Sequence, residues 1–138
     1  MTTDSELLSV IPAERCLTLL EAVPYGRLAT VDMGRPFLVV LNHLVEAGDI
    51  YVRTRPDARL ARLTEGGRVV HAIYEVDSAF PLGEQGWSVM AKGLLRREYG
   101  DTRSSRLRSE LTAWAHGDRD VVLHLEIQEL TGRHVGPA

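Results

Sequence analysis

The sequence predicts a mainly β (α+β) fold, in which six antiparallel strands form a barrel with helices at its periphery. Apolar and polar residues alternate over short segments, as they do in half-buried strands. Glycine-containing turns separate several of these segments at hairpin spacing. The strands do not alternate regularly with helices, which argues against a parallel nucleotide-binding sheet. Closure into a barrel is the simplest arrangement because it removes exposed sheet edges.

The first half of the chain predicts one helix and three strands. The helix covers residues 12–23, begins at Pro12 and ends at Pro24. Strands are expected at 27–32, 36–45 and 50–54, with hairpin turns at 32–35 and at Gly48. The run from Phe37 to Leu41 is entirely apolar, so we expect the second strand to be buried on both faces.

The second half predicts two helices and three strands within the same single domain, residues 1–138. One helix begins at Pro56 and Asp57 and ends at Gly66, and the other begins at Asp101 or Thr102. The second helix is expected to bury Leu107, Leu111 and Trp114. Strands are expected at 68–76, 87–98 and 121–127. Residues 1–10 are expected to form an N-terminal segment, and residues 131–138 a loose tail.

Composition restricts the classes of function. The chain has 138 residues, of which 44% are hydrophobic and 25% charged, as expected for one folded domain. A net charge of −3 and only 6% aromatic residues argue against a nucleic-acid partner. No apolar run approaches the roughly 18 residues that a membrane span needs. The single cysteine, Cys16, fits a reducing compartment, so we expect a soluble cytoplasmic protein.

The junction between the third strand and the following helix is a candidate phosphate site. Arg53, Thr54, Arg55 and Arg59 gather there, and a guanidinium can bind a phosphate through paired donors. The start of a helix also favours an anion. Asp57 opposes this reading, and a solvated arginine cluster explains the pattern about equally well.

Two further strands carry unusual polar residues. Lys92 is the only lysine and stands in the apolar strand at 87–98, so its ammonium should meet a carboxylate, a phosphate or solvent. Gly93 beside it suggests a bulge or a close backbone approach. Asn42 and His43 interrupt the second strand, where they either bond a flat heterocycle or mark the point at which the strand meets solvent.

Other kinds of site lack support in the sequence. The five histidines and Cys16 have no metal-ligand spacing, so no metal site is expected. We find neither a nucleophile elbow nor a glycine-rich phosphate loop. Glu75 and Asp77 follow an apolar strand and are interpreted as a solvated turn.

Four segments together resemble the actinobacterial-type pyridoxamine 5′-phosphate oxidase-like proteins. They are Pro24-Tyr25-Gly26-Arg27-Leu28-Ala29-Thr30, the stretch from Gly34-Arg35-Pro36 to Asn42-His43, Ile50-Tyr51-Val52-Arg53-Thr54 with Arg59-Leu60, and Trp87-Ser88-Val89-Met90-Ala91-Lys92-Gly93. The resemblance covers residues 12 to about 98 well. It implies a six-stranded split β-barrel that forms a homodimer and binds FMN at the subunit interface.

The resemblance also implies a set of cofactor-binding residues. Arg53, Thr54 and Arg59, with neighbouring Leu60, would hold the phosphate; Leu41, Asn42 and His43 would face the isoalloxazine; Trp87, Ser88 and Lys92 would line the same site from the adjoining strand. Arg59 stands where the family has lysine, and His43 where it has an aromatic residue. These departures leave a deazaflavin open as an alternative cofactor. The implied function is an FMN-dependent oxidoreductase acting on a small organic substrate, with a deazaflavin-dependent reductase or a non-catalytic flavin carrier as alternatives. No side chain is identified as a catalytic acid or base.

Overall fold

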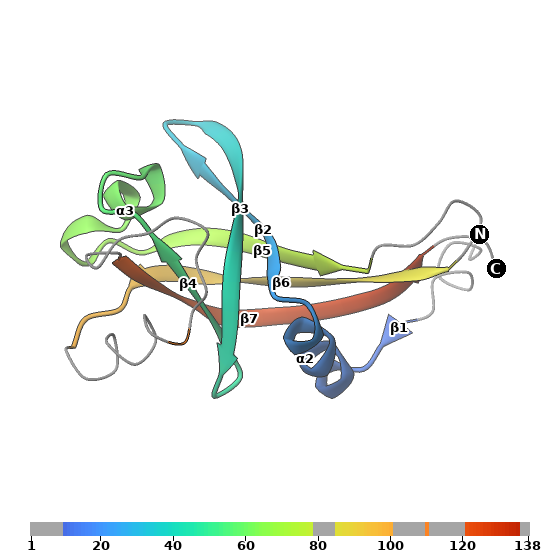
Figure 1. Cartoon of the computed structure of the whole chain (residues 1–138). Coiled ribbons are helices and arrows are strands. Elements are labelled where there is room, and N and C mark those ends of the chain that lie inside the picture. The colour runs from blue at the N-terminus through green and yellow to red at the C-terminus, as the bar shows by residue number, and fades with distance from the viewer. Residues whose placement is uncertain (1–9, 79–84, 101–109, 111–120, 136–138) are drawn as a thin grey trace.

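The chain folds into a split β-barrel, in which one antiparallel sheet curls around an apolar core (Figure 1). The computed structural model describes residues 10–78, 85–100, 110 and 121–135. The strands are β1 (Val10–Ile11), β2 (Tyr25–Asp32), β3 (Arg35–Glu46), β4 (Asp49–Thr54), β5 (Val70–Asp77), β6 (Gly86–Arg97) and β7 (Val121–Val135). The helices are α2 (Ala13–Ala22) and α3 (Arg59–Leu63), followed by a 3₁₀ turn at Glu65–Gly67.

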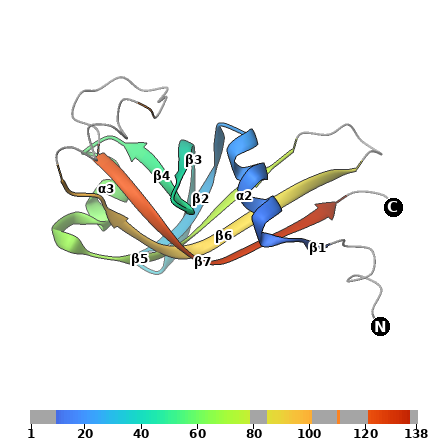
Figure 2. The same ribbon diagram turned by 90° about the horizontal axis from the view of Figure 1, so that it is seen from below.

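The sheet confirms the barrel expected from the sequence and adds one strand to it. The strand order is β1-β7-β4-β3-β2-β5-β6, and a further pairing of β6 with β7 closes six strands into a ring. All pairings are antiparallel. The seventh strand, β1, has two residues and pairs with the end of β7. Figure 2 shows α2 and α3 at opposite ends of the barrel.

Both expected hairpin turns are present. Met33 and Gly34 join β2 to β3 with φ values of 52° and 76°, and Ala47 and Gly48 join β3 to β4 with 52° and 81°. Two successive residues with positive φ form the turn whose twist matches the flanking strands. The register that follows pairs Asp32 with Arg35.

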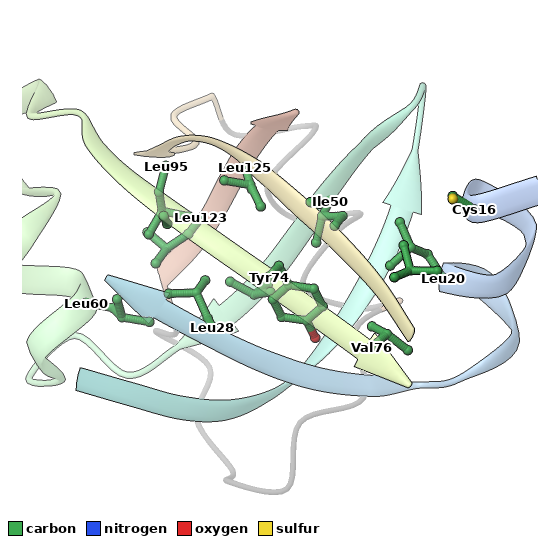
Figure 3. Packing of buried hydrophobic residues seen from close by; sticks show 14 of the residues in the cluster. Cys16, Leu20, Leu28, Ile50, Leu60, Tyr74, Val76, Leu95, Leu123 and Leu125 are labelled. Atoms are coloured by element: carbon green, nitrogen blue, oxygen red, sulfur yellow. The ribbon is translucent and has the colours of Figure 1, made fainter. Parts of the chain in front are cut away.

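Side chains of alternate residues fill the barrel. Leu28 of β2, Tyr74 and Val76 of β5, and Leu95 of β6 are fully buried (Figure 3). Leu20 of α2 and Leu60 of α3 are buried in the same core from the two ends. Because alternate residues of a strand point to opposite faces, this inner row fixes which side chains face outward.

The end of the chain differs from the expectation. Residues 131–138 were expected to form a loose tail, but β7 continues to Val135 and pairs with β6 from Leu123 to its end. The inward position at Gly132 has no side chain because a Cβ there would lie 2.6 Å from the sulfur of Cys16. This close packing against α2 holds a stretch of polar residues in the sheet.

The helix after β4 is shorter than expected. Pro56 and Asp57 were expected in its first turn, but α3 begins at Arg59, after an extended Ala58. The backbone N–H of Ala58 donates to the carbonyl of Arg55 at 3.0 Å, so Pro56 and Asp57 form a separate turn. The expected helix after Asp101 lies outside the described residues, apart from Glu110.

Strand β3 differs from a third expectation. Its outward side chains were expected to be buried, but Leu38 is 59% and Val40 47% exposed in the single chain. Phe37, Val39 and Leu41 on the other face pack against the core. The strand therefore has one buried face and one exposed apolar face.

Within the described residues, no helix is long and apolar enough to cross a membrane.

Candidate functional site

The exposed apolar side of the barrel spans four neighbouring strands. We call it the outer face and define it by Arg27, Ala29 and Val31 of β2, Leu38 and Val40 of β3, Ile73 and Glu75 of β5, and Met90 and Lys92 of β6. The strand register aligns Leu38, Ala29, Ile73 and Lys92 in one row across the sheet. Val31, Leu38, Val40, Ile73 and Met90 are all exposed. Contiguous exposed apolar surface of this kind marks binding and association sites.

A hollow of about 660 Å³ opens on this outer face. It is lined by Ala29, Thr30, Val31, Pro36, His71, Ala72, Ile73, Lys92, Gly93, Gln128 and Glu129. Most of these side chains are small or apolar, which suits the flat surface of an aromatic ring. The volume lies within the range of small-molecule sites.

Lys92 lies at one side of the hollow, as the sequence led us to expect of a residue that needs an anionic partner or solvent. Its side chain is half exposed, and its ammonium lies 3.7 Å from the carboxylate of Glu129 on β7. The strand register shifts between Lys92 and Gly93, which confirms the expected bulge. A Cβ on Gly93 would collide with the carbonyl oxygen of Glu126, so the backbones of β6 and β7 approach closely here.

The arginines of the β4–α3 junction are not among the residues that line the hollow. The Nε of Arg59 is 3.5 Å from the carboxylate of Asp32, and its guanidinium lies 4.9 Å above the ring of Phe37. Asp32 follows Val31 on β2 and therefore points to the opposite face, and Phe37 packs against the core, so these two contacts place Arg59 on the inner side of the β2–β3 hairpin. Arg55 is paired with Asp57 at 3.3 Å and does not approach the hollow through any described contact. Arg59 thus contacts the β2–β3 hairpin, whose Val31 and Pro36 line the hollow from the other face.

The residues expected from β3 fall on two faces of the strand. Asn42 points outward, like Leu38 and Val40. Because His43 pairs with Val52, the next residues along the two strands, Asn42 and Arg53, are neighbours across β3 and β4. Leu41 and His43 point the other way. The side chain of Leu41 is partly buried and packs against the core.

His43 is held inside the molecule by two hydrogen bonds. Its Nε2 donates to the carbonyl of Leu20 in α2 at 2.7 Å, and its Nδ1 lies 2.7 Å from the hydroxyl of Tyr74. That hydroxyl donates to the carbonyl of Leu41 at 2.9 Å. Burial lowers the pKa of His43, and the carbonyl of Leu20 partly opposes this effect. These contacts make His43 a link between α2, β3 and β5.

A second hollow, of about 300 Å³, lies beside Asn42 and His43. Glu21 and Glu110 also line it. Two carboxylates make this hollow a poor site for a phosphate.

The remaining expected residues are also divided. Leu60 is 2% exposed and belongs to the core, so its side chain cannot touch a ligand on the outer face. Thr54 ends β4 opposite Val121. On β6, Trp87 packs against the core, whereas Ser88 has the outward parity of Lys92. In the sheet, β2 and β5 separate β6 from β3.

At the end of the outer face where Arg27 and Glu75 lie, the structure has a charged cluster that was not expected from the sequence. One guanidinium nitrogen of Arg27 lies 2.9 Å from Glu75 and 3.1 Å from Asp77. The two carboxyls were interpreted as a solvated turn, but β5 extends to Asp77 and both are about two-thirds buried or more. Burial and the neighbouring Asp77 raise the pKa of Glu75 to about 7, with Arg27 acting in the opposite direction. The sequence does contain an indication of this cluster. Glu75 and Asp77 alternate with buried residues in the same way as Ile73, so all three side chains point outward.

Among the described residues, no group of three or more histidine, cysteine or carboxylate side chains could hold a metal ion. The chemistry of the outer face therefore rests on its apolar hollow and on the charged side chains around it.

This combination defines a split barrel with a small-molecule-sized hollow between charged rims. The family model described as pyridoxamine 5′-phosphate oxidase matches residues 12–134. The chain therefore belongs to the pyridoxamine 5′-phosphate oxidase family, as the four sequence segments had suggested.

Individual relatives support the same placement. The uncharacterized protein Rv0080 of Mycobacterium tuberculosis is 30% identical over 122 residues, which cover 86% of this chain and 80% of that protein. A Corynebacterium glutamicum structure, provisionally named a pyridoxamine 5′-phosphate oxidase, has a TM-score of 0.79 at 21% identity and covers 94% of this chain and 99% of its own. The FAD binding protein of Mycobacterium smegmatis has a TM-score of 0.74 at 21% identity, with 91% and 97% covered. At these identities the two structures establish the fold.

Proposed function

We propose that this protein binds FMN on its outer face and serves as an oxidoreductase for a small organic substrate. The observation that carries the proposal is the hollow of about 660 Å³, which is largely apolar and has Lys92 on its lining. Membership of a family named for an oxidase supports it. So does the similarity in fold to a protein named for FAD binding.

The phosphate of the flavin would be held at the β4–α3 junction. Arg53, Thr54 and Arg59 supply two guanidinium groups and a hydroxyl within seven residues of chain. Helix α3 has only five residues, so the side chains rather than the helix dipole would provide the attraction. Asp32 competes for Arg59 at 3.5 Å and would have to yield to the phosphate.

The isoalloxazine would lie in the hollow, against the small and apolar side chains of Ala29, Val31 and Ile73. The ammonium of Lys92 would meet an electronegative edge of the ring, in exchange for its long contact to Glu129. A bound flavin would supply the capacity to accept and donate hydride or electrons. The chain's part is to position the ring and to exclude water from one side of it.

A second copy of the chain would complete the site. Within one chain, two strands separate Ser88 and Lys92 on β6 from Asn42 on β3 in either direction around the barrel, and β7 separates them from Arg53 on β4. A homodimer formed through the outer face would bring β6 of one protomer toward β3 of the other. It would also cover the exposed Leu38 and Val40.

Replacing Arg53 or Arg59 by alanine should weaken FMN binding. Charge-assisted hydrogen bonds contribute roughly 1.5–3 kcal/mol each, which corresponds to an affinity loss of about ten- to hundredfold. Flavin fluorescence quenching would measure the dissociation constants of both variants and of the parent protein. Arg15→Ala, which removes one positive charge from an exposed position on α2, is the matched control.

The same titration separates the alternatives. If FAD or a deazaflavin binds more tightly than FMN, the proposed cofactor changes but the proposed binding site does not. Bound FMN that no reductant or substrate turns over would indicate a carrier. FMN affinity that is unaltered by both Arg53→Ala and Arg59→Ala would contradict the proposed phosphate site.

A further inference from the structure

The Arg27–Glu75–Asp77 cluster has one positive group for two carboxyls. A single Nη of Arg27 contacts both Glu75 and Asp77, at 2.9 Å and 3.1 Å. With both carboxyls ionised, the cluster carries a net charge of −1. With one proton bound, it is neutral.

The Arg27–Glu75 pair lies in the last row of the outer face, between two exposed apolar side chains, and Asp77 lies one outward position beyond it. The register places Val40 beside Arg27, Arg27 beside Glu75, and Glu75 beside Met90, on four adjoining strands. Val40 and Met90 are both exposed. Anything that covers these two side chains must also cover the cluster and remove water from it.

The charged neighbours of Glu75 are few among the described residues. Strand β2 presents Arg27 and, at its next outward position, Tyr25; β5 itself presents Asp77 and, farther along, His71 in the hollow. Strand β6 presents the uncharged Met90 and Ser88, and its Lys92 lies one outward position away, beside Glu129. No described cation other than Arg27 therefore offsets the second carboxylate.

The charge balance of the face favours a second copy of the chain as its occupant. The charges of Lys92 and Glu129 cancel each other. When the Arg27–Glu75–Asp77 cluster binds one proton, neither this pair nor the cluster carries a net charge. In a twofold dimer the same patch meets itself, and neutral patches avoid the like-charge repulsion that two ionised clusters would create. A strongly charged partner would find no complementary excess here.

We propose that two copies of the chain associate through the outer face with uptake of a proton by each Arg27–Glu75–Asp77 cluster, so that the dimer tightens as the pH falls through neutrality. This proposal rests on the dimer of the proposed function. The raised pKa of Glu75, about 7 in the single chain, places the uptake near neutral pH. Covering the cluster disfavours the ionised form further, because desolvation penalises charge.

The direction of the pH dependence of dimerisation follows from the linkage between proton binding and association. Below about pH 7 the free chain already carries the proton, so dimer affinity does not change with pH. Above it the free chain loses the proton that the dimer retains, and association must bind it again. With one proton per protomer, the dissociation constant rises by up to about a hundredfold per pH unit.

Sedimentation equilibrium of the full chain between pH 5.5 and 8.5 tests the proposal. The parent protein should show a dissociation constant that rises above about pH 7. Glu75→Gln keeps the shape and leaves Arg27 paired with Asp77, so this variant should form a tight dimer at every pH. Glu129→Gln removes a carboxylate from the pair with Lys92 and, as the matched control, should keep the pH dependence of the parent.

Three results would overturn the proposal: a parent dimer whose affinity does not change with pH, a Glu75→Gln variant that retains the parent's slope, or a chain that stays monomeric throughout. Circular dichroism of each sample verifies folding. FMN fluorescence on the same samples tests flavin binding independently of dimerisation. A monomer that binds FMN would remove the dimer and its proton linkage while leaving flavin binding intact.

Discussion

Arg59, one of the residues proposed to bind the phosphate, already has other partners in the structure. Its guanidinium is shared between the carboxylate of Asp32 and the ring of Phe37, whereas the proposed cofactor needs it for a phosphate. Asp32 is three-quarters buried, so its negative charge is poorly screened. Sequence reasoning identified Arg59 but not Asp32, because the two are 27 positions apart and meet only through the β2–β3 hairpin.

Removing that charge should strengthen FMN binding. Asp32→Asn frees Arg59 from a pair whose Coulomb contribution is roughly 0.2–1 kcal/mol and removes a repulsive charge near the phosphate. We expect affinity to rise by about two- to fivefold, as measured by fluorescence titration at low salt. Glu14→Gln, at an exposed position on α2, changes the net charge equally and should leave affinity as it is. Equal or weaker binding by Asp32→Asn would indicate that the phosphate binds elsewhere.

At the scale of the strands, periodicity predicted most of the barrel. Strands β2, β3 and β4 and helix α2 were expected within about three residues of their observed bounds, because their apolar residues alternate or recur with clear periods. The second half of β7 was missed for a physical reason. Its inward positions include Gly132, whose missing side chain makes room for Cys16, so the sequence there has no apolar alternation.

The candidate site was less predictable than the strands. Parity along β3 separates Asn42 from Leu41 and His43, but the resemblance had assigned all three to the cofactor. The sequence also could not show that two strands separate β6 from β3, because that order depends on the long-range pairing of β2 with β5. Lys92 and Gly93, in contrast, were correctly identified as unusual, since an ammonium and a missing side chain are each costly within an apolar strand.

The close approach of β6 and β7 predicts that a side chain at Gly93 would destabilise the fold. Gly93→Ala should destabilise the fold by about 1–3 kcal/mol or more, because its Cβ would collide with backbone at Glu126, which cannot rotate away. Urea unfolding at fixed protein concentration would show the loss as a lower midpoint with an unchanged slope. Lys92→Ala, the adjacent outward residue, loses only a long exposed ion pair and should stay within about 0.5 kcal/mol of the parent. Equal midpoints for Gly93→Ala and the parent would mean that the bulge is free to open.

For the molecule as a whole, the outer face combines two properties that a lone barrel does not need. It has an apolar hollow and, around the hollow, exposed apolar side chains on β2, β3, β5 and β6. Its charged residues are arranged in small clusters that approach neutrality, which permits burial against an identical surface. The proposed homodimer uses both properties at once, because the surface that associates is also the surface that holds the ring.

A charge placed on this surface should therefore separate the protomers without unfolding them. In Leu38→Glu the new carboxylate replaces a side chain that is 59% exposed in the single chain, so the isolated barrel tolerates it. In a twofold dimer it would be desolvated beside apolar groups of the other copy, which is strongly unfavourable for an unpaired charge. Light scattering at neutral pH should show a shift from dimer to monomer, with unchanged circular dichroism and weaker FMN binding. Val10→Glu adds the same charge at an exposed position on β1, away from the outer face, and should remain dimeric. A Leu38→Glu variant that is still a dimer would place the interface on a different side of the barrel.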